Sequence, residues 1–386
     1  MCPTGATEEH VDTIVIGGGA MGSATAWQLA RRGRDVLLLE RFSAGHTKGA
    51  SHGESRNFNV AYAEKTYVDL LVEALPLWRE LEAESGSSIL DITGIANHGD
   101  NPAFDAVHTA LTAAGIPAEF LSPEEAGERW PGIRFDTRVL NTPQAGRLNA
   151  NRAVTALQAV AAERGATVLH EAVATRVDVL GDDRVRVEAT IGGESRVFTA
   201  RRVVVTVGAW TNKLLSGVIE TPRLVVTQEQ PVHFAVRDDS LAWPGFNHAP
   251  GVGGQYDYWR SPVYGMFTPG EGVKAGWHGV GPVVDPDARD YLPEPAQLAA
   301  LQQYARDWLP GVDADSFVPI SCTYTTAPDS NFIIDRVGPV AVGAGFAGHG
   351  FKFTPTVGRL LADLVDDRGP APHLFSLHAN RAEAQR

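Results

Sequence analysis

The first apolar run of the chain, residues 13–16, is followed by a glycine-rich turn, a stretch of helical periodicity and a second apolar run at 36–39. Continuous apolar runs of this length are typical of strands buried on both faces, as in parallel sheets. A third run, at 202–207, also leads into glycine, far downstream. We therefore expect a strand–helix–strand unit near the N-terminus and a later return of the chain to the same parallel sheet.

Apolar residues also recur at helical spacing between residues 67 and 81, which predicts a long helix. Similar patterns predict three further helices, at 103–114, 150–165 and 356–364. Runs rich in β-branched residues predict strands at 166–170, 175–179, 184–198, 332–335 and 340–345.

The segment 224–318 has a different character, because it combines proline, glycine and aromatic residues with short alternating runs. This pattern predicts an antiparallel sheet. The expected fold class is therefore α/β, with a Rossmann-type nucleotide-binding domain interleaved with an α+β substrate domain built on an antiparallel sheet. The expected nucleotide-binding domain is discontinuous and comprises residues 8–88, 149–223 and 323–386, and the substrate domain comprises 89–148 and 224–322.

Length, charge and cysteine content narrow the class of protein. A chain of 386 residues exceeds what one hydrophobic core usually supports, which agrees with two domains. A net charge of −13 without a Lys/Arg cluster argues against a nucleic-acid partner. The chain lacks an apolar stretch of membrane-spanning length and a signal peptide at its start, so we expect a cytoplasmic protein that does not bind membranes. Two cysteines, Cys2 and Cys322, are too few for a disulfide framework.

The turn after the first strand has the sequence G-x-G-x-x-G, with glycines at 17, 19 and 22. Gly17 permits a sharp turn, Gly19 permits close approach of a pyrophosphate, and Gly22 permits close packing of helix and strand. Phosphates would then meet the positive end of the helix dipole. Glu40, at the end of the second strand, would accept hydrogen bonds from ribose hydroxyls. The unit therefore predicts a dinucleotide site, without distinguishing flavin from nicotinamide.

Further motifs along the chain are more specific. They are His52-Gly53-Glu54-Ser55-Arg56, Arg129-Trp130-Pro131-Gly132-Ile133, Gly208-Ala209-Trp210, Lys274-Ala275-Gly276-Trp277-His278, Cys322-Thr323-Tyr324 and Gly348-His349-Gly350-Phe351-Lys352-Phe353. In this order, over residues 11–374, the chain resembles the monomeric sarcosine oxidase and N-methyltryptophan oxidase family.

The resemblance implies a flavoenzyme that binds FAD, oxidises a secondary amine to an imine and passes the electrons to O2, giving hydrogen peroxide. With an N-methyl amine, hydrolysis of the imine amounts to N-demethylation. The resemblance also implies a monomer, and we expect no metal. Two alternatives are a flavin-dependent dehydrogenase or desaturase of a biosynthetic intermediate, and a flavoprotein that has lost its chemistry.

The resemblance implies FAD contacts from each segment of the nucleotide-binding domain and from the late cysteine. The expected cofactor-binding residues are Gly17, Gly19, Ala20, Met21, Gly22, Glu40, Arg41, Ser51, Val173, Gly208, Trp210, Cys322, Gly348, Gly350 and Lys352. A lone cysteine is commonly a small buried hydrophobe. Here, however, Cys322 matches the family cysteine that forms a thioether with the flavin, so we expect covalent FAD.

Two basic residues in the segment 272–278 match family catalytic residues. Lys274 would place a positive charge beside the flavin and stabilise the negative charge that develops as oxygen accepts an electron. A solvated lysine on a strand edge is the structural alternative. His278 would lie beside the substrate amine, where it would influence protonation, although a core histidine is also compatible with the pattern.

His52 and Arg56 lie in a loop of small polar residues after the second strand. The resemblance places both against the flavin ring, where positive charge favours the reduced cofactor. Lys352 matches a lysine that, with an arginine, clamps the substrate carboxylate in the family. The arginine position is Asn59 here, and an amide lacks the charge and the two-pronged donors of a guanidinium. We therefore expect a substrate other than plain sarcosine, or a compensating cation.

The candidate compensating cation is Arg260, in the aromatic stretch Tyr256-Asp257-Tyr258-Trp259-Arg260, shortly before Tyr264. If this stretch lines the mouth of the site, Tyr258 and its neighbours would favour a larger or aromatic substrate. A surface hairpin is the alternative.

Overall fold

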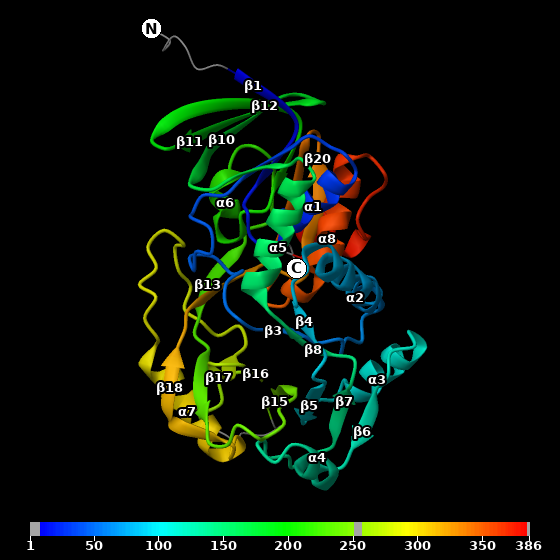
Figure 1. Cartoon of the computed structure of the whole chain (residues 1–386), viewed down its shortest axis with the longest axis vertical. Coiled ribbons are helices and arrows are strands. Elements are labelled where there is room, and N and C mark those ends of the chain that lie inside the picture. Colours follow the sequence, from blue (N-terminus) through cyan, green and yellow to red (C-terminus); the bar gives the residue numbers. More distant parts are fainter. Residues whose placement is uncertain (1–7, 251–256, 384–386) are drawn as a thin grey trace.

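The computed structural model describes residues 8–250 and 257–383. Cys2 and Tyr256 lie outside the described residues. Within these ranges the strands form two eight-stranded sheets and two small sheets, with helices packed mainly around the first large sheet (Figure 1). The α/β fold class predicted from the sequence is confirmed.

The first sheet contains the predicted N-terminal unit. Strand β1 (Glu8–Ile16) leads through a glycine turn into helix α1 (Ala20–Arg31) and strand β2 (Val36–Leu39). β1 pairs in parallel with β2 on one side and with β12 (Glu194–Val205) on the other. The remaining strands of this sheet are β9 (Thr167–Leu169), β10 (Ala172–Gly181), β11 (Arg184–Ile191), β20 (Ile333–Val337) and β21 (Val340–Ala344).

Three helices cover this sheet: α1, α5 (Ala150–Glu163) and α8 (Thr354–Val365). α1 and α8 approach closely because a Cβ on Gly358 would lie 2.5 Å from the backbone of Ala24. Helix α2 (Lys65–Ser85) packs against α5 and α8, and its buried side chains include Trp78. The helices predicted at 67–81, 150–165 and 356–364 are thus confirmed, as is α3 (Phe104–Ala113).

The second sheet has the order β18-β14-β17-β16-β15-β5-β7-β6 and is antiparallel except for the parallel pair β15–β5. Its strands are β5 (Ile95–Gly99), β6 (Glu119–Leu121), β7 (Val139–Thr142), β14 (Val232–Val236), β15 (Gly245–Ala249), β16 (Val263–Thr268), β17 (Gly272–Trp277) and β18 (Val312–Pro319). The segment 224–318 also contains a helix where only strands were expected, α7 (Pro295–Trp308). Its Leu301, Tyr304 and Trp308 are buried against the sheet.

The remaining elements are short. They are β3 (Arg56–Phe58), β4 (Leu90–Asp91), α4 (Pro123–Arg129), β8 (Gly146–Leu148), η1 (Gly208–Trp210), α6 (Thr211–Leu214), β13 (Val225–Glu229), β19 (Cys322–Thr326), η2 (Phe351–Phe353), η3 (His373–Phe375) and α9 (Leu377–Glu383). β13 pairs with β19, so Cys322 lies opposite Glu229. β13 runs between the parts of the molecule that hold the two large sheets (Figure 1).

Candidate functional site

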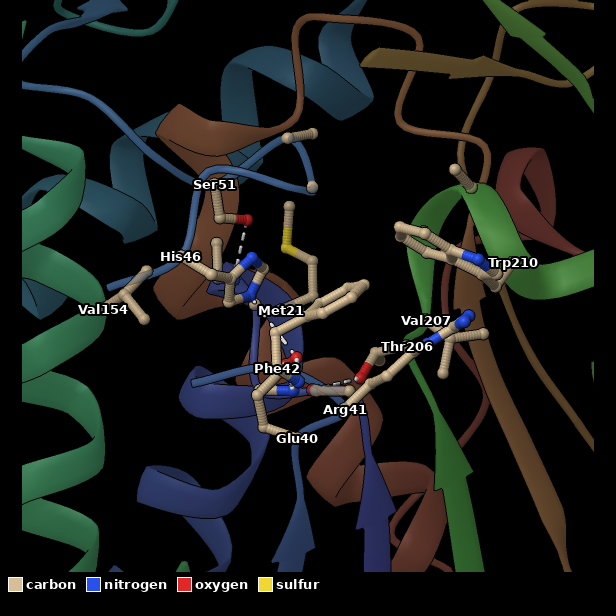
Figure 2. Close-up of a pocket in the computed structure, with 18 of the residues that line it drawn as sticks. Met21, Glu40, Arg41, Phe42, His46, Ser51, Val154, Thr206, Val207 and Trp210 are labelled. Atoms are coloured by element: carbon tan, nitrogen blue, oxygen red, sulfur yellow. Dashed lines mark hydrogen bonds and ion pairs between the residues drawn. The ribbon is translucent and has the colours of Figure 1, made fainter. Parts of the chain in front are cut away.

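A cavity of about 700 Å³ opens at the carboxyl ends of the parallel strands β1 and β2. Figure 2 shows side chains from the β1–α1 turn, the segment after β2 and the end of β12 arranged around it. Most of the expected cofactor residues line the cavity: Gly17, Gly19, Ala20, Met21, Glu40, Arg41, Ser51, Val173, Gly208, Trp210, Cys322, Gly348 and Gly350. Its volume falls in the range of cofactor sites.

The glycine turn leaves no room for side chains at two of its positions. Gly17 has φ +99°, and a Cβ there would lie 2.5 Å from the carbonyl oxygen of Thr206. A Cβ on Gly22 would lie 1.9 Å from the carbonyl oxygen of Gly17. Gly22 therefore does not line the cavity but lets α1 start directly beneath the turn, with its N-terminus directed at the cavity.

Glu40 anchors both segments at this end of the cavity. One carboxylate oxygen accepts the amide of Gly18 at 2.7 Å, and the other accepts the amide of Phe42 at 2.8 Å. Burial alone would raise its pKa, but hydrogen bonds from His46 and from these amides outweigh burial and lower it. Glu40 is thus an anionic anchor of the turn, and its predicted contact with ribose stays a prediction.

Ser51 caps the start of α1, because its hydroxyl accepts the amide of Ala20 at 3.0 Å. This contact joins the loop after β2 to the glycine turn. Loop and helix therefore form one wall of the cavity.

Three charged side chains on the cavity wall, Arg41, Lys213 and Asp287, form one group of ion pairs. Asp287, from the loop between β17 and α7, accepts the indole N–H of Trp210 at 2.7 Å and pairs with Arg41 at 3.0 Å and Lys213 at 2.5 Å. Hydrogen bonds from Lys213 and Trp210 lower its pKa to about 2. Asp287 therefore ties a loop that follows β17 of the second sheet to the segments after β2 and β12.

The opposite end of the cavity carries His52, Arg56 and Cys322. The guanidinium of Arg56, at the start of β3 rather than in the predicted loop, donates to the carbonyl oxygens of His52 at 2.6 Å and Ala50 at 2.9 Å. Burial, then the charges of Arg56 and Lys274, lowers the pKa of His52 to about 3. His52 is therefore neutral beside a fixed cation, and the half-buried thiol of Cys322 faces the same wall.

Lys274 lies in the middle of the second sheet and is 4% exposed, so it is not a solvated edge lysine. Its ammonium lies 3.4 Å from the carbonyl oxygen of Ser55, next to Arg56. Burial, followed by the charge of Arg56, lowers its pKa to about 7. The predicted Lys274, Arg56 and Cys322 are therefore gathered in one place, since the charges of the last two act on the first.

Lys352 is the second buried lysine, in η2 directly before α8. Its ammonium donates to the hydroxyl of Tyr62 at 3.0 Å and to the carbonyl oxygen of His349 at 2.7 Å. Burial lowers its pKa to about 7. Nδ1 of His349 lies 3.2 Å from the same Tyr62 hydroxyl, so the three side chains form one hydrogen-bonded group.

His278 lies just beyond β17, facing two tyrosines. The hydroxyl of Tyr324 lies 3.4 Å from its Nδ1, and the ring of Tyr264 lies 6.5 Å from its ring. His278 is exposed as a residue, but its neighbours remove part of the water around its ring. This loss of hydration, followed by the positive charge of Lys352, lowers the pKa of His278. Tyr324 also lines the cavity, so this group adjoins the Cys322 end.

The other predicted substrate residues are placed differently. The side-chain oxygen of Asn59 accepts the amide of Ala61 at 3.0 Å, in a local turn. Tyr258 donates to Asp307 on α7 at 2.6 Å, and Arg260 is exposed. Tyr258 and Arg260 are not among the residues that line the cavity, and neither is Lys352, so the compensating role of Arg260 stays a prediction.

Some residues of the site were missed in the sequence. Tyr62 and His349 surround Lys352, while His170 and Asp287 line the cavity. His170 follows β9 directly, and its position at the end of a parallel strand was a usable signal. Asp287 lies in a loop without periodicity, and its role depends on contacts with distant segments.

The described residues contain no helix that could span a membrane. In the same part of the chain, no group of three His, Cys, Asp or Glu residues is arranged to bind a metal ion.

The residues present fit a dinucleotide. A Cβ on Gly19 would lie 3.1 Å from the Ser51 hydroxyl, tighter than ordinary contact, so glycine leaves the start of α1 open towards the cavity. Two buried ring nitrogens on the cavity wall, Nε2 of His52 and Nδ1 of His170, are without a hydrogen-bond partner among the described residues. Such orphaned atoms are explained by a bound group that supplies their partners.

Comparisons with known proteins agree with this geometry. Residues 12–364 match the family described as FAD dependent oxidoreductase. The chain is 32% identical to a monomeric sarcosine oxidase of Bacillus sp. (strain NS-129) over 97% of each chain. It is 30% identical to an N-methyl-L-tryptophan oxidase of Yersinia pestis over 94% of this chain and 96% of the relative.

The fold has close counterparts among solved structures. A variant of NikD, described as an unusual amino acid oxidase essential for nikkomycin biosynthesis, superposes with a TM-score of 0.83 at 27% identity and covers 96% of this chain and 97% of its own. An L-proline dehydrogenase from P. horikoshii shares the fold, with a TM-score of 0.81 at 22% identity. The superposition covers 98% of this chain and 100% of the dehydrogenase chain. The chain therefore belongs to the family of FAD dependent oxidoreductases and is related over nearly its whole length to the monomeric sarcosine oxidases.

Proposed function

We propose that the protein is an oxidase that converts a secondary amine, an N-methyl or cyclic amine or amino acid derivative, to an imine with O2 as the electron acceptor. The observation that carries this proposal is a pair of buried lysines, Lys274 and Lys352. Lys274 lies close enough to Cys322, on the cavity wall, for the charge of the thiol to act on its pKa. FAD, when bound, takes a hydride equivalent from the amine and passes two electrons to O2, giving hydrogen peroxide.

Lys274 supplies the positive charge that favours electron transfer to oxygen. A preorganised cation in a water-poor site stabilises developing negative charge more strongly than solvent does. Lys274 and Arg56 are both fixed by backbone carbonyl oxygens, so neither has to reorganise during the reaction. A dehydrogenase that excludes oxygen would have little use for this arrangement.

Lys352 binds an anionic or carbonyl group of the substrate. At pH values below about 7 its ammonium is charged, and its two protein partners leave one N–H available for a substrate oxygen. Asn59 adds no charge here, so binding of a carboxylate rests on Lys352. This supports a substrate that gains part of its affinity from groups other than a carboxylate, in contact with Tyr264, His278 and Tyr324.

Cys322 holds the flavin covalently in this proposal. Its thiol lies on the cavity wall within reach of the carbonyl oxygen of Ala50 at 3.9 Å, close to His52 and Arg56. We further propose a monomer, as the name of the Bacillus relative states for that protein, and a cytoplasmic location.

The test is peroxide release from the purified holoenzyme with a panel of N-methyl and cyclic amines, with and without carboxylates. We expect release with at least one member and a loss of oxygen reactivity in Lys274→Met. Normal flavin binding together with flavin reduction but no peroxide would favour the dehydrogenase alternative. Flavin binding without reduction by any amine would overturn the proposed activity.

A further inference from the structure

A row of three directly opposed residues crosses the second sheet towards Lys274. His233 on β14 lies opposite Lys274 on β17, and on its other side His233 lies opposite Val318 on the edge strand β18. Directly opposed residues of antiparallel strands project from the same face of the sheet. Val318, His233 and Lys274 therefore share one face of the sheet, from which the ammonium of Lys274 reaches the carbonyl oxygen of Ser55.

Exposure changes steeply along this row. Val318 is 63% exposed, whereas His233 is 5% and Lys274 4% exposed. The edge of the sheet is thus in water, and one imidazole separates it from the buried ammonium. The carboxylate of Glu271 lies 3.4 Å from Nδ1 of His233, with 44% of its side chain exposed. A carboxylate in contact with solvent, a buried imidazole and a buried ammonium therefore follow one another.

The charges around this row suit proton exchange. Burial, then Lys274 and Arg56, lowers the pKa of His233 to about 3, so its ring is neutral and carries one donor and one acceptor nitrogen. Lys274 faces Arg56, Cys322 and Glu271, and the charge of Glu271 opposes the decrease in its pKa caused by burial. Burial, then the charge of Glu54, raises the pKa of Glu271. The pKa of Glu271 is thus raised and the pKa of Lys274 is lowered, so the two values lie closer together than those of the free side chains.

We propose that Glu271 and His233 form a proton conduit between solvent and Lys274, with His233 as the relay and Glu271 as its solvent end. The inference rests on the proposed oxidase function and assigns a role to two residues outside the cofactor cavity. His233, Glu271 and Lys274 are not among the residues that line the cavity, but the ammonium of Lys274 reaches the carbonyl oxygen of Ser55, beside Arg56 on the cavity wall. His233 and Glu271 therefore act through Lys274.

The proton balance gives the conduit its task. An amine that becomes an imine loses two electrons and two protons, and O2 takes up two electrons and two protons to become hydrogen peroxide. The electrons and one hydrogen nucleus leave the carbon together as hydride, and the proton from nitrogen leaves separately. The proton from nitrogen is released to solvent. Formation of hydrogen peroxide needs a proton in its place, and the conduit delivers this proton from solvent through His233 to Lys274.

The test uses the holoenzyme and separates the two half-reactions by stopped-flow absorbance of the flavin. His233→Phe and Glu271→Gln should leave flavin reduction by the amine without O2 within about twofold of wild type. Reoxidation by O2 should be slowed at least about tenfold above pH 7, where protons are scarce. Glu271→Asp should retain most of the wild-type rate.

Two further readouts exclude a structural effect. A small diffusible acid such as imidazole or formate should rescue reoxidation in His233→Phe, and the solvent deuterium isotope effect on reoxidation should increase. Asp315→Asn, an exposed carboxylate change on β18 of the same sheet, is the matched control and should leave all rates unchanged.

The outcomes distinguish the two proposals. If wild type releases peroxide and Lys274→Met is slow, but the His233 and Glu271 variants reoxidise normally, the conduit is wrong and the oxidase proposal stands. Slow reoxidation without rescue by either acid also overturns the conduit, because a distorted Lys274 explains it. A wild-type enzyme that releases no peroxide overturns both.

Discussion

Lys352 donates a hydrogen bond to the hydroxyl of Tyr62 at 3.0 Å, and this contact joins η2, directly before α8, to the segment before α2. Burial lowers the pKa of Lys352 to about 7. The proportion of charged Lys352 at neutral pH therefore depends on its few hydrogen-bond partners. Tyr62 is one of the two that the described residues provide.

Tyr62→Phe should weaken substrate binding near neutral pH. Losing one acceptor removes stabilisation from the ammonium form, about 1.5–3 kcal/mol for a hydrogen bond to a charged group, so the pKa of Lys352 falls further. At pH 7.5 KM for a carboxylate substrate should rise about tenfold, and the rise should shrink as the pH is lowered towards 6. The measurement is KM against pH. A pH-independent increase in KM would contradict this explanation.

Asn59→Arg should improve the use of a small N-methyl amino acid. A guanidinium at the position where the family has its arginine offers a charged, two-pronged contact to the carboxylate. Each hydrogen bond to a charged group contributes about 1.5–3 kcal/mol before the lost Asn59–Ala61 turn is subtracted. KM for sarcosine should fall about tenfold. An N-methyl amine without a carboxylate serves as the control substrate, and an equal change with both would show that Asn59 acts on the shape of the site alone.

Cys322→Ala should release the flavin from the denatured protein. Acid precipitation of wild type should leave the yellow colour in the pellet, because the proposed thioether survives unfolding, while the variant should lose its colour to the supernatant. Absorbance spectra of both fractions provide the measurement. Colour released from both proteins would mean that Cys322 is only a packing residue on the cavity wall.

Asp287→Ala should accelerate flavin dissociation when the covalent bond is absent. Asp287 joins the loop after β17 to Trp210, Arg41 and Lys213 across the cavity, and these half-exposed contacts are worth at most about 1 kcal/mol each. In a Cys322→Ala background, the dissociation rate measured by flavin fluorescence should rise about three- to tenfold. Asp315→Asn, which removes a similar exposed pair with Arg306, should have no effect.

Much of the nucleotide-binding half followed from local patterns. The glycines of the first turn, the strand at 202–207 and the helix at 356–364 each carry their signal within a few residues, and β1 pairs with β12 as the buried runs predicted. The helix α7 was missed although Leu301, Tyr304 and Trp308 follow helical spacing, because proline and aromatic residues around it favoured strands.

The rest of the site depends on long-range register. Lys274 could be singled out in the sequence, but its neighbour His233 is 41 positions away and is brought opposite it only by the pairing of β14 with β17. Asp287 likewise acquires its partners from segments near 41 and 210. Tyr258 shows the converse, because an aromatic residue near a substrate motif donates instead to α7. Patterns along the chain specify elements more readily than contacts between them.

Buried histidines give the fold a sensitivity to acid. His98 on β5 and His248 on β15 stack with ring centroids 3.8 Å apart, and both ring nitrogens of His98 are without partners in the described structure. Burial lowers the pKa of His98 to about 3 and that of His248 well below its ordinary value. Protonation of either ring would place charge in an apolar layer, and protonation of both would add repulsion.

His98→Phe should therefore make the protein less sensitive to acid. Below pH 6.5 the unfolded chain binds a proton on His98 that the native state does not, so stability is lost as the pH falls from about 6.5 towards 3. At pH 5 this one group accounts for about 2 kcal/mol. Phenylalanine keeps a stacked ring without the proton, so the decrease in Tm between pH 6.5 and 4.5 should become shallower than in wild type. Exposed His373→Phe should keep the wild-type slope, and an equal slope in His98→Phe would exclude His98 as a source of the acid sensitivity.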